Sequence, residues 1–380
     1  MRLCKRAIVM RSYIIIIGSV SFFEKNLQEL SAKGAEFNDV ITLFDTARTT
    51  GKRLQKKNSS LIVRNNHYHG IVESAHARLG GLIEDVTEKD ALVYIHNPTR
   101  ILFHYIRREY EAENCNLQLI EESRSSLAEI SDVQKKIEDV RRKIIGQDNA
   151  LEQIAKTLNY LASTKRNKPY VLMLYGNSSL GKTETAKAIA DTFFDGKMIE
   201  RHLSMFEDFS LANSDYLFGG KPNVNSLGYE LNERESNLVF FDEMDKCGAS
   251  YRSAFYSLFD NPTFLDTTYE VDISGLLIVL TCNFLTEEDI RRNLGDPIYF
   301  RIDKSIYFED FSPNNLLKIL EIEADKQLSQ IVNHEDINRQ QVIRLAARKI
   351  LVTESNGRTV QAAVRSTIEN LWGLPSLGAF

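Results

Sequence analysis

The sequence predicts an α/β protein built on parallel sheets and ending in a helical region. Short apolar runs that read as buried strands alternate with amphipathic helical segments along most of the 380 residues. A glycine-containing loop between one such strand and the next helix has the form of a phosphate cradle. From residue 313 onward the pattern is helical. The chain is longer than one hydrophobic core usually supports, so we expect more than one domain.

The first domain is expected over residues 1–123, as a Rossmann-like α/β unit. Its helix after the first strand should begin with a capping box formed by Ser21 and Glu24. Alternation of strands and helices favours a parallel sheet with helices on both faces. We predict strands at 13–18, 39–44, 61–64, 91–96 and 117–122, and helices at 21–30, 68–83 and 100–113.

The rest of the chain divides into three further segments. Residues 124–143 are predicted to form a linker helix, because their apolar residues share one helical stripe. A second α/β block should cover 144–312, and a helical lid should cover 313–380. The stripe of the linker helix consists of Leu127, Ile130, Val133, Ile137 and Val140.

Composition limits which partners and which cellular compartment we expect for the protein. The net charge of -5 gives no global attraction for nucleic acid or an anionic membrane surface. The four cysteines are far apart in the sequence, which favours reduced thiols and a cytoplasmic protein. The chain has a basic start, but Arg11 interrupts the apolar run that follows, so we expect no signal peptide. Without a run of about 18 apolar residues, we expect no membrane span.

The cradle itself is the segment "YGNSSLGKTETAK" at 175–187, which fits the pattern G-x-x-x-x-G-K-[ST]. It follows the apolar run 170–176 and opens a helix, so its backbone N–H groups should wrap phosphates at a helix N-terminus. Lys182 should reach the β and γ oxygens of ATP, and Thr183 should be a ligand of Mg²⁺. We assign ATP contacts to Gly176, Asn177, Ser178, Ser179, Leu180, Gly181, Lys182, Thr183 and Glu184.

Two further strand ends carry residues suited to ATP hydrolysis. The run "NLVFFDEMDK" at 237–246 ends in adjacent acids: Asp242 would help to hold Mg²⁺, and Glu243 would polarise the attacking water. A third apolar run ends at Asn283, whose amide could orient that water. This arrangement predicts a magnesium-dependent ATPase.

The order of these motifs resembles the Clp-type AAA+ module, especially the C-terminal ATPase ring of the Clp unfoldases and the related torsins. The resemblance covers residues 140–372 and includes "IIGQDNALEQIAKTL", "FDEMDK", "YFRID" and "GRTVQAAV". It implies a homo-oligomeric ring, expected to be a hexamer, that acts on a protein. It also implies roles for five residues: Ile144 and Ile145 flanking adenine, Asn283 as sensor 1, Arg301 as an arginine finger for the neighbouring subunit, and Arg358 as sensor 2.

Two segments depart from the Clp pattern. The Clp pore loop carries an aromatic residue that grips polypeptide, whereas residues 217–233 have Asn223, Val224 and Asn225 at that place. Tyr229 follows but is not clearly in register. Residues 284–298 are too short for the loop that docks a Clp peptidase, so we expect no such partner.

The first domain shows no resemblance, and its role stays open. His67, His69 and His76 could suggest a metal site, but ordinary histidines explain them better, because the sequence fixes no complete ligand set. The basic segment 48–57 reads as a solvated loop rather than a phosphate-binding patch. The first strand and turn could hold a nucleotide or sugar phosphate, although G-x-G-x-x-G is absent. Recruitment of a partner or substrate is the interpretation we favour.

Three functions are compatible with the sequence. The leading one is an ATP-hydrolysing ring that remodels a protein substrate or complex. The first alternative is an ATP-dependent oligomeric switch, torsin-like or signalling, that activates or recruits a partner without threading. The second is a nucleic-acid-linked ATPase, which the net charge of -5 and the Clp-like motif order argue against.

Overall fold

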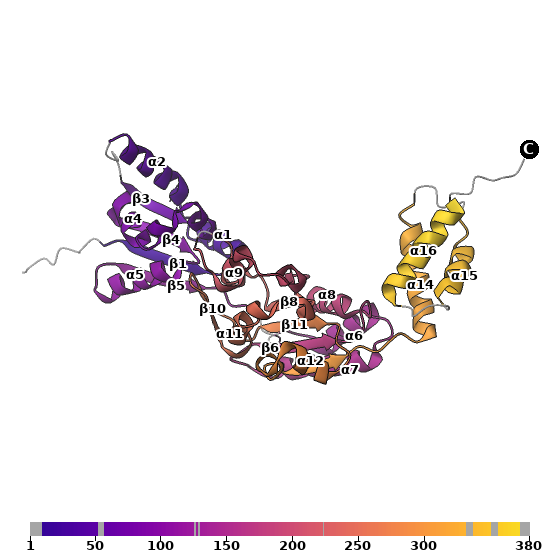
Figure 1. Cartoon of the computed structure of the whole chain (residues 1–380). Helices are drawn as coiled ribbons and strands as arrows, with labels where there is room; N and C mark the ends of the chain where they lie inside the picture. Colours follow the sequence, from indigo (N-terminus) through magenta and orange to yellow (C-terminus); the bar gives the residue numbers. More distant parts are fainter. Residues whose placement is uncertain are drawn as a thin grey trace, which may run out of the picture.

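The computed structural model describes residues 10–51, 57–124, 127, 130–222, 224–331, 337–350 and 356–372. Three bodies follow one another along the chain: a first domain, a large subdomain and a helical lid (Figure 1). The start of the chain, the centre of the basic segment 48–57, part of the predicted linker helix and Asn223 lie outside the described residues. In the part of the chain that is described, no helix has the length and apolar character needed to span a membrane.

The first domain contains a five-stranded sheet in the order β2-β3-β4-β1-β5, with every pair parallel. Neighbouring residues of β1 point to opposite faces: Ile15 belongs to one buried cluster, and Ile14 and Ile16 belong to another. The predicted parallel α/β fold is therefore confirmed. The strands are β1 (Ser12–Ile17), β2 (Ala35–Glu36), β3 (Asn58–Val63), β4 (Thr87–His96) and β5 (Asn116–Glu121).

The strand predicted at 39–44 is wrong, because this segment lies within helix α2 (Phe37–Thr49). Its β-branched residues suggested a strand, but Phe37, Val40 and Phe44 recur at helical spacing and pack into the core of the first domain. The hydroxyl of Thr42 donates to the carbonyl of Asn38, one turn earlier, at 2.8 Å. Tertiary packing thus overrides the local strand preference.

Other helix boundaries also differ from the prediction. Ser19, not Ser21, caps α1 (Val20–Glu29), because its Oγ accepts from the backbone N–H of Phe22. The helix predicted over 68–83 is divided into a 3-10 turn and two short helices. These are η1 (Asn65–Gly70), α3 (Glu73–His76) and α4 (Leu79–Val86), and α5 (Arg100–Glu111) follows β4.

The large subdomain contains a second parallel sheet in the order β12-β6-β11-β8-β7. Helices cover both faces, and the alternating residues of β6 feed two separate buried clusters. Strands β6 and β11 are buried along their whole length, as expected for central parallel strands. The strands are β6 (Tyr170–Tyr175), β7 (Ile199–His202), β8 (Leu238–Asp242), β11 (Leu277–Cys282) and β12 (Lys304–Tyr307).

Helix α6 (Val133–Lys143) begins later than the helix predicted over 124–143. Its buried residues Ile137 and Val140 pack in the same core cluster as residues of α8 (Lys182–Phe193), the helix that follows the cradle. The remaining helices of the large subdomain surround the sheet, and β9 (Thr263–Leu265) and β10 (Glu270–Asp272) form a small antiparallel hairpin. These helices include α7 (Asp148–Ala162), α9 (Leu211–Phe218), α10 (Leu227–Glu233), α11 (Ala254–Asp260), α12 (Glu287–Leu294) and α13 (Asp296–Tyr299).

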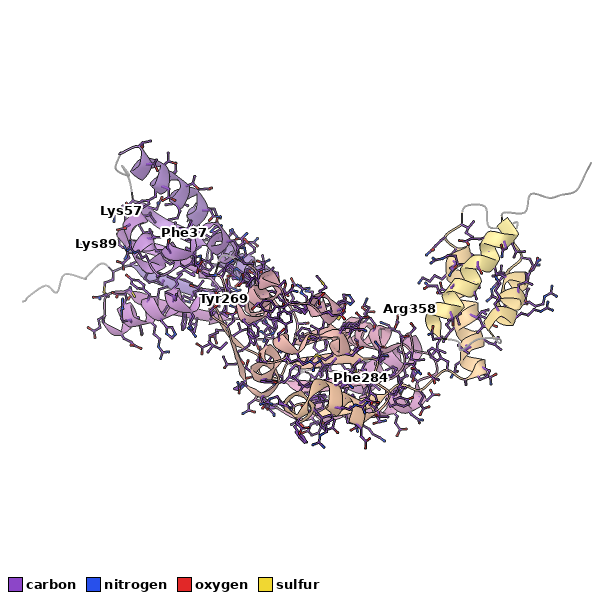
Figure 2. The ribbon with its side chains drawn as sticks, viewed as in Figure 1. Phe37, Lys57, Lys89, Tyr269, Phe284 and Arg358 are labelled. Atoms are coloured by element: carbon purple, nitrogen blue, oxygen red, sulfur yellow. The ribbon has the colours of Figure 1, made fainter. Side chains whose placement is uncertain are left out.

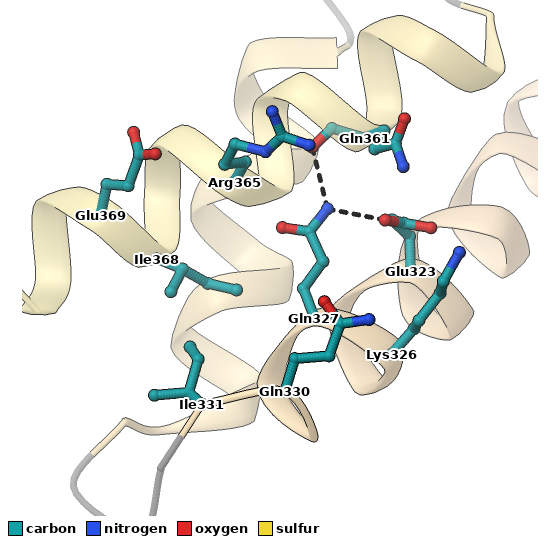
Figure 3. A pocket seen from close by; sticks show the side chains of 9 residues that line it. All are labelled: Glu323, Lys326, Gln327, Gln330, Ile331, Gln361, Arg365, Ile368 and Glu369. Atoms are coloured by element: carbon teal, nitrogen blue, oxygen red, sulfur yellow. Dashed lines mark hydrogen bonds between the residues drawn. The ribbon is translucent and has the colours of Figure 1, made fainter. Parts of the chain in front are cut away.

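The lid consists of α14 (Pro313–Leu328), α15 (Arg339–Ile350) and α16 (Gly357–Trp372), and the predicted helical C-terminal region is confirmed. Its small core is formed by apolar side chains of all three helices, among them Leu320, Val342 and Val364. Figure 3 shows how Gln327 of α14 bridges two partners: its Nε2 donates to Glu323 at 2.7 Å and to the carbonyl of Gln361 on α16 at 3.1 Å. The lid therefore has a core and internal hydrogen bonds of its own.

Candidate active site

The cradle lies between β6 and α8, and two of its glycines are required by the backbone. Gly176 has φ of 136°, and a Cβ at this position would lie 2.4 Å from the carbonyl oxygen of Phe308. Gly181, with φ of 95°, caps α8 in the left-handed region. Ser179 also has positive φ, at 62°. These conformations turn the loop around the N-terminus of α8, where unpaired N–H groups attract anions.

Lys182 is 6% exposed and reaches three acceptors. Its Nζ donates to the carbonyl oxygens of Gly176 at 2.8 Å and Asn177 at 2.6 Å, and to Oδ1 of Asn283 at 3.2 Å. Burial lowers the pKa of the Lys182 ammonium, and the nearby negative groups, Asp245 among them, oppose that shift in part. The positive charge is therefore held at the mouth of the cradle by groups that a phosphate could replace.

Thr183 and Asp242 provide a hydroxyl and a carboxylate at the same edge of the sheet. Thr183 Oγ1 lies 3.3 and 3.5 Å from the two carboxylate oxygens of Asp242. Oxygen donors of this kind suit Mg²⁺, which keeps several waters and takes few protein ligands. The pair thus fits the predicted metal, and these are the residues that would hold it.

Glu243 follows Asp242 in a backbone conformation that is unusual for a residue with a side chain. Its φ and ψ are 59° and 49°, in the left-handed region. The backbone N–H of Glu243 donates to Thr281 Oγ1 at 3.0 Å, and the Thr281 hydroxyl donates in turn to Asp242. Strain of this kind persists where the surroundings fix the geometry, and here it turns the chain sharply at the second of two adjacent acids.

Asn283 comes directly after β11, which lies between β6 and β8 in the sheet. Its amide contacts residues that follow both flanking strands: Oδ1 accepts from Lys182 at the start of α8, and Nδ2 donates at 3.3 Å to Asp245 in the turn after β8. The structure therefore brings Lys182, Thr183, Asp242, Glu243 and Asn283 together at the carboxyl edge of three adjacent strands.

Sequence reasoning missed Thr281, Asp245 and His202. Thr281 is two residues before Asn283, so strand alternation places both on one face and could have identified it. Asp245 lies in the motif "FDEMDK" but had no assigned role. His202 ends β7 beside Asp242 and its Nδ1 lies 3.4 Å from Oδ2 of that acid, a contact that only the strand pairing reveals.

Replacing Thr281 with valine is expected to slow ATP hydrolysis about 10- to 100-fold, because it removes a hydrogen bond to charge worth about 1.5–3 kcal/mol. Thr281 is 2% exposed, and valine keeps its shape. The rate at saturating ATP should fall while nucleotide affinity stays within about twofold. Thr281→Ser keeps the hydroxyl and is the matched control. A Thr281→Val protein with the wild-type rate would contradict this role.

The segment 144–147 contacts the cradle and the residues that precede the lid. Ile144 is 9% exposed, and its Cγ2 lies 4.0 Å from where a Cβ of Gly181 would stand. Gln147 is buried and donates to the carbonyls of Leu180 at 3.1 Å and Glu309 at 2.9 Å. Ile145, predicted with Ile144 to flank adenine, is half-buried in the same bend. An apolar surface therefore lies beside the cradle.

Other predicted cradle residues differ in their surroundings. Asn177 Nδ2 donates to Asp310 Oδ1 at 2.9 Å, and Leu180 is buried. Ser179 has a buried hydroxyl for which no partner exists among the described residues. Ser178 and Glu184 are exposed at the rim of the cradle.

Arg301 contacts α11 and α13 rather than the cradle. Its Nε lies 3.0 Å from Asp260 Oδ2, its Nη1 donates to the carbonyl of Pro297 at 2.7 Å, and its guanidinium lies over the Tyr256 ring. The adjacent Phe300 is 69% exposed. The two short helices α12 and α13 take up most of the segment between Asn283 and Arg301.

Arg358 is exposed near the start of α16. The N–H of Gly357, the residue before it, donates to the carbonyl of Ser179 at 3.1 Å, so the start of α16 touches the cradle. Figure 2 labels Arg358 at the edge of the lid that faces the large subdomain. Arg358 thus lies one residue from a direct contact between the lid and the cradle.

The segment compared with a pore loop runs from α9 into α10. Val224 is 43% exposed, whereas Tyr229 on α10 lies against the first domain, with its ring centroid 5.1 Å from that of His69. Tyr229 also lies 6.1 Å, between ring centroids, from Tyr269 in the same junction. Of the two aromatic residues in this segment, Tyr229 therefore packs in a domain junction, whereas Phe218 at the end of α9 is 36% exposed.

Polar groups at the first domain's strand ends have partners within the chain. Glu122 accepts from the N–H of Ser19 at 2.6 Å and from its hydroxyl at 2.9 Å, so a carboxylate of the same chain occupies the start of α1. His67 Nδ1 accepts from the N–H of Arg64, and His76 Nε2 lies 3.3 Å from the carbonyl of Ile71. Over the described ranges, no group of three His, Cys, Asp or Glu residues could hold a metal ion.

Comparison with known proteins identifies the family of this chain. Residues 167–359 match the AAA domain (Cdc48 subfamily). The chain is 33% identical to the AAA+ ATPase ClpV1 of Pseudomonas aeruginosa over 162 residues, 39% of this chain and 18% of that protein. It is 22% identical to the chaperone protein ClpB of Prochlorococcus marinus over 352 residues, 82% of this chain and 37% of ClpB. The chain therefore spans well under half the length of these relatives.

A solved structure is similar along most of the chain. It is a closed-state cryo-electron microscopy reconstruction of Hsp104 with ATPγS and casein, at a TM-score of 0.53 and 14% identity. The match covers 95% of this chain and 87% of the Hsp104 chain. At this identity the likeness concerns the fold, and it supports the α/β AAA+ architecture with its helical C-terminal region.

Proposed function

This chain belongs to the AAA domain family, with a Clp-type AAA+ module, and we propose that it is a magnesium-dependent ATPase that assembles into a ring and remodels a protein substrate or complex. The observation that carries the ATPase is the meeting of Lys182, Thr183, Asp242, Glu243 and Asn283 at one sheet edge. Each of these residues has a distinct chemical task in that arrangement.

The tasks follow from the contacts. Lys182, held by loop carbonyls, exchanges them for the β and γ oxygens of ATP. Thr183 and Asp242 would hold Mg²⁺, which would neutralise part of the charge of the phosphates. Glu243 accepts the proton of the attacking water, and Asn283, fixed between Lys182 and Asp245, orients that water. Ile144 and Ile145 would flank the adenine, and Arg358 would carry the state of the nucleotide to the lid.

The position of the Arg301 side chain favours assembly into a ring. Its guanidinium is directed by Asp260 and Tyr256 to a surface beside the exposed Phe300, rather than to the cradle of its own chain. An arginine in this place would serve the ATP of a neighbouring subunit, so each site would be completed by two copies of the chain. We expect a homo-oligomer, most naturally a hexamer. The proposed setting is the cytoplasm, in keeping with the free, buried Cys115, Cys247 and Cys282.

A second candidate function is favoured by the place of Tyr229. A threading ring grips polypeptide with exposed pore aromatics, but Tyr229 packs against His69 of the first domain. Among the residues described, the exposed large apolar side chains of that segment are Val224, at 43%, and Phe218, at 36%. An ATP-dependent switch, in which the ring gathers first domains to recruit or activate a partner, would need no such grip.

The proposed ATPase should show a specific activity that rises with protein concentration in Mg²⁺, because each site needs a neighbour. Phosphate release and light scattering, measured on the same dilution series, would test this. A constant, monomer-like rate or no hydrolysis at any concentration would contradict the proposal. Added casein separates the two candidates: remodelling predicts stimulation of the rate, and the switch predicts none.

A further inference from the structure

The first domain rests on the large subdomain through the carboxyl edge of its own sheet. Asn65 Nδ2 donates to Glu233 Oε1 at 3.0 Å, and the Tyr269 hydroxyl donates to Asn65 Oδ1 at 2.8 Å. The N–H of Arg100 donates to the carbonyl of Thr268 at 2.7 Å. Figure 2 labels Tyr269 at this junction. We call these five residues the docking interface.

The docking interface is held by polar contacts and is incompletely sealed. A cavity of about 550 Å³ lies between α5 and the β9–β10 hairpin. Burial raises the pKa of the Glu233 carboxyl, although hydrogen bonds from Asn65 and Tyr229 oppose the shift. His96 lies 3.9 Å from Glu233, but burial lowers the pKa of His96 to about 4, so the pair carries no ionic attraction at neutral pH. Polar interfaces of this type permit relative domain motion.

Helix α10 contributes to this interface and also contacts the sheet that carries the ATP site. Tyr229 and Glu233 face the first domain, where they meet His69 and Asn65. Glu230, on the same helix, instead pairs with Arg201 of β7. A single helix of seven residues thus touches the first domain and the large sheet.

The contacts continue without a gap to the ATP site. Arg201 Nε donates to the Tyr216 hydroxyl at 3.0 Å, and that hydroxyl donates to Glu230 Oε2 at 2.7 Å. The residue after Arg201 is His202, whose Nδ1 lies 3.4 Å from Asp242, one of the predicted magnesium ligands. Hydrogen bonds join Arg201, Tyr216 and Glu230 to one another. Movement of one of these side chains therefore breaks or weakens charged hydrogen bonds of the other two.

We propose that α10 couples the ATP site to the first domain, so that the nucleotide state sets how tightly the carboxyl edge of the first domain is docked. The two states are the docked arrangement of Figure 1 and a loosened one in which Asn65 and Glu233 separate. The inference rests on the proposed ATP site. If it holds, residues 217–233, which stand where Clp proteins have a pore loop, transmit the nucleotide state to the first domain instead of gripping polypeptide.

Amide hydrogen exchange of the full chain tests this coupling. Peptides covering residues 61–72, which include η1, would be followed with and without ATPγS and Mg²⁺. Couplings of ordinary size change such an equilibrium about 5- to 150-fold, so we expect a change of about tenfold in exchange rate in the wild type. In Glu230→Gln, which breaks the charged contact with Arg201, the change should shrink to within about twofold.

Two further variants keep the test decisive. Glu235→Gln alters a surface acid close to the end of α10 that pairs with Lys197, and it should retain the wild-type response. Tyr216→Phe removes only the hydroxyl that bridges Arg201 and Glu230. It should also weaken the exchange response, and it takes the place of Glu230→Gln if that variant does not fold. Nucleotide binding is measured on the same samples by equilibrium dialysis. Bound ATPγS with unchanged exchange at η1 would overturn the coupling alone, whereas no bound ATPγS would overturn the ATP site.

Discussion

Glu243→Gln is expected to bind ATP with nearly wild-type affinity and to hydrolyse it about 10²- to 10⁴-fold more slowly, the usual loss when a general base is removed. Glutamine keeps the size of the side chain but cannot accept the proton of the attacking water. The backbone N–H of Glu243 still donates to Thr281, so the turn after β8 should be preserved. Single-turnover hydrolysis and nucleotide dialysis would measure the two effects separately.

The control for this variant is Glu288→Gln, because Glu288 is exposed on α12, away from the cradle. It should hydrolyse ATP like the wild type. Glu243→Gln should also accumulate the ATP-bound assembly, visible as a larger species by light scattering. If Glu243→Gln hydrolyses ATP at the wild-type rate, the assignment of the whole site is wrong.

The core of the candidate site could be predicted because it depends on local patterns. A buried strand, a glycine loop and a helix start place Lys182 and Thr183, whatever the rest of the fold does. Asp242 ends one buried strand and Asn283 follows another, and carboxyl ends of parallel strands meet at one edge. The strand order, with β11 between β6 and β8, brings the three ends together.

What could not be predicted depends on residues that are distant in the sequence. Asn65 and Glu233 are separated by 168 positions, and neither stands in a recognisable motif. Tyr229 is not clearly in register with a pore-loop aromatic, and the sequence does not predict its contact with His69, which depends on how the two domains pack. Patterns within one element carry no information about such packing.

Segment 39–44 shows the same limit at the level of secondary structure. Its valine, isoleucine and threonine residues favour a strand locally, but Phe37, Val40 and Phe44 gain more by burying one helical face. The predicted cap at Ser21 failed for a related reason. Ser19 lies two residues after the end of β1, and Glu122, which follows the neighbouring strand β5, accepts a hydrogen bond from its backbone N–H.

Arg301→Ala is expected to lower ATP hydrolysis about 10³- to 10⁵-fold, the effect of removing an arginine finger, while leaving ATP binding intact. The side chain belongs to the surface beside Phe300, so the loss should fall on a neighbour's site rather than on its own. A Lys182→Ala subunit cannot use its own ATP site, but it still provides Arg301 to a neighbour. An Arg301→Ala subunit keeps its ATP site and lacks the arginine. Mixing the two inactive proteins should therefore restore activity.

The size of that restoration follows from the ring. In a random equal mixture, an active site needs an Arg301→Ala subunit next to a Lys182→Ala subunit on the correct side, which holds for about a quarter of heterologous interfaces. Recovery of about a quarter of wild-type activity, measured as phosphate release, is the expected result. Arg292→Ala, which removes an exposed arginine paired with Asp289, is the matched control and should be fully active.

Arg301 also pairs with Asp260, so its removal could act through local structure instead. Arg301→Lys distinguishes the two effects, because lysine can keep an ion pair with Asp260 but lacks the planar fork that binds phosphate oxygens in two places. We expect Arg301→Lys to unfold like the wild type and still to lose most of its activity. If the mixture of inactive subunits stays inactive while both proteins assemble, Arg301 does not act across a subunit boundary, because assembled rings would then contain completed sites that fail to turn over.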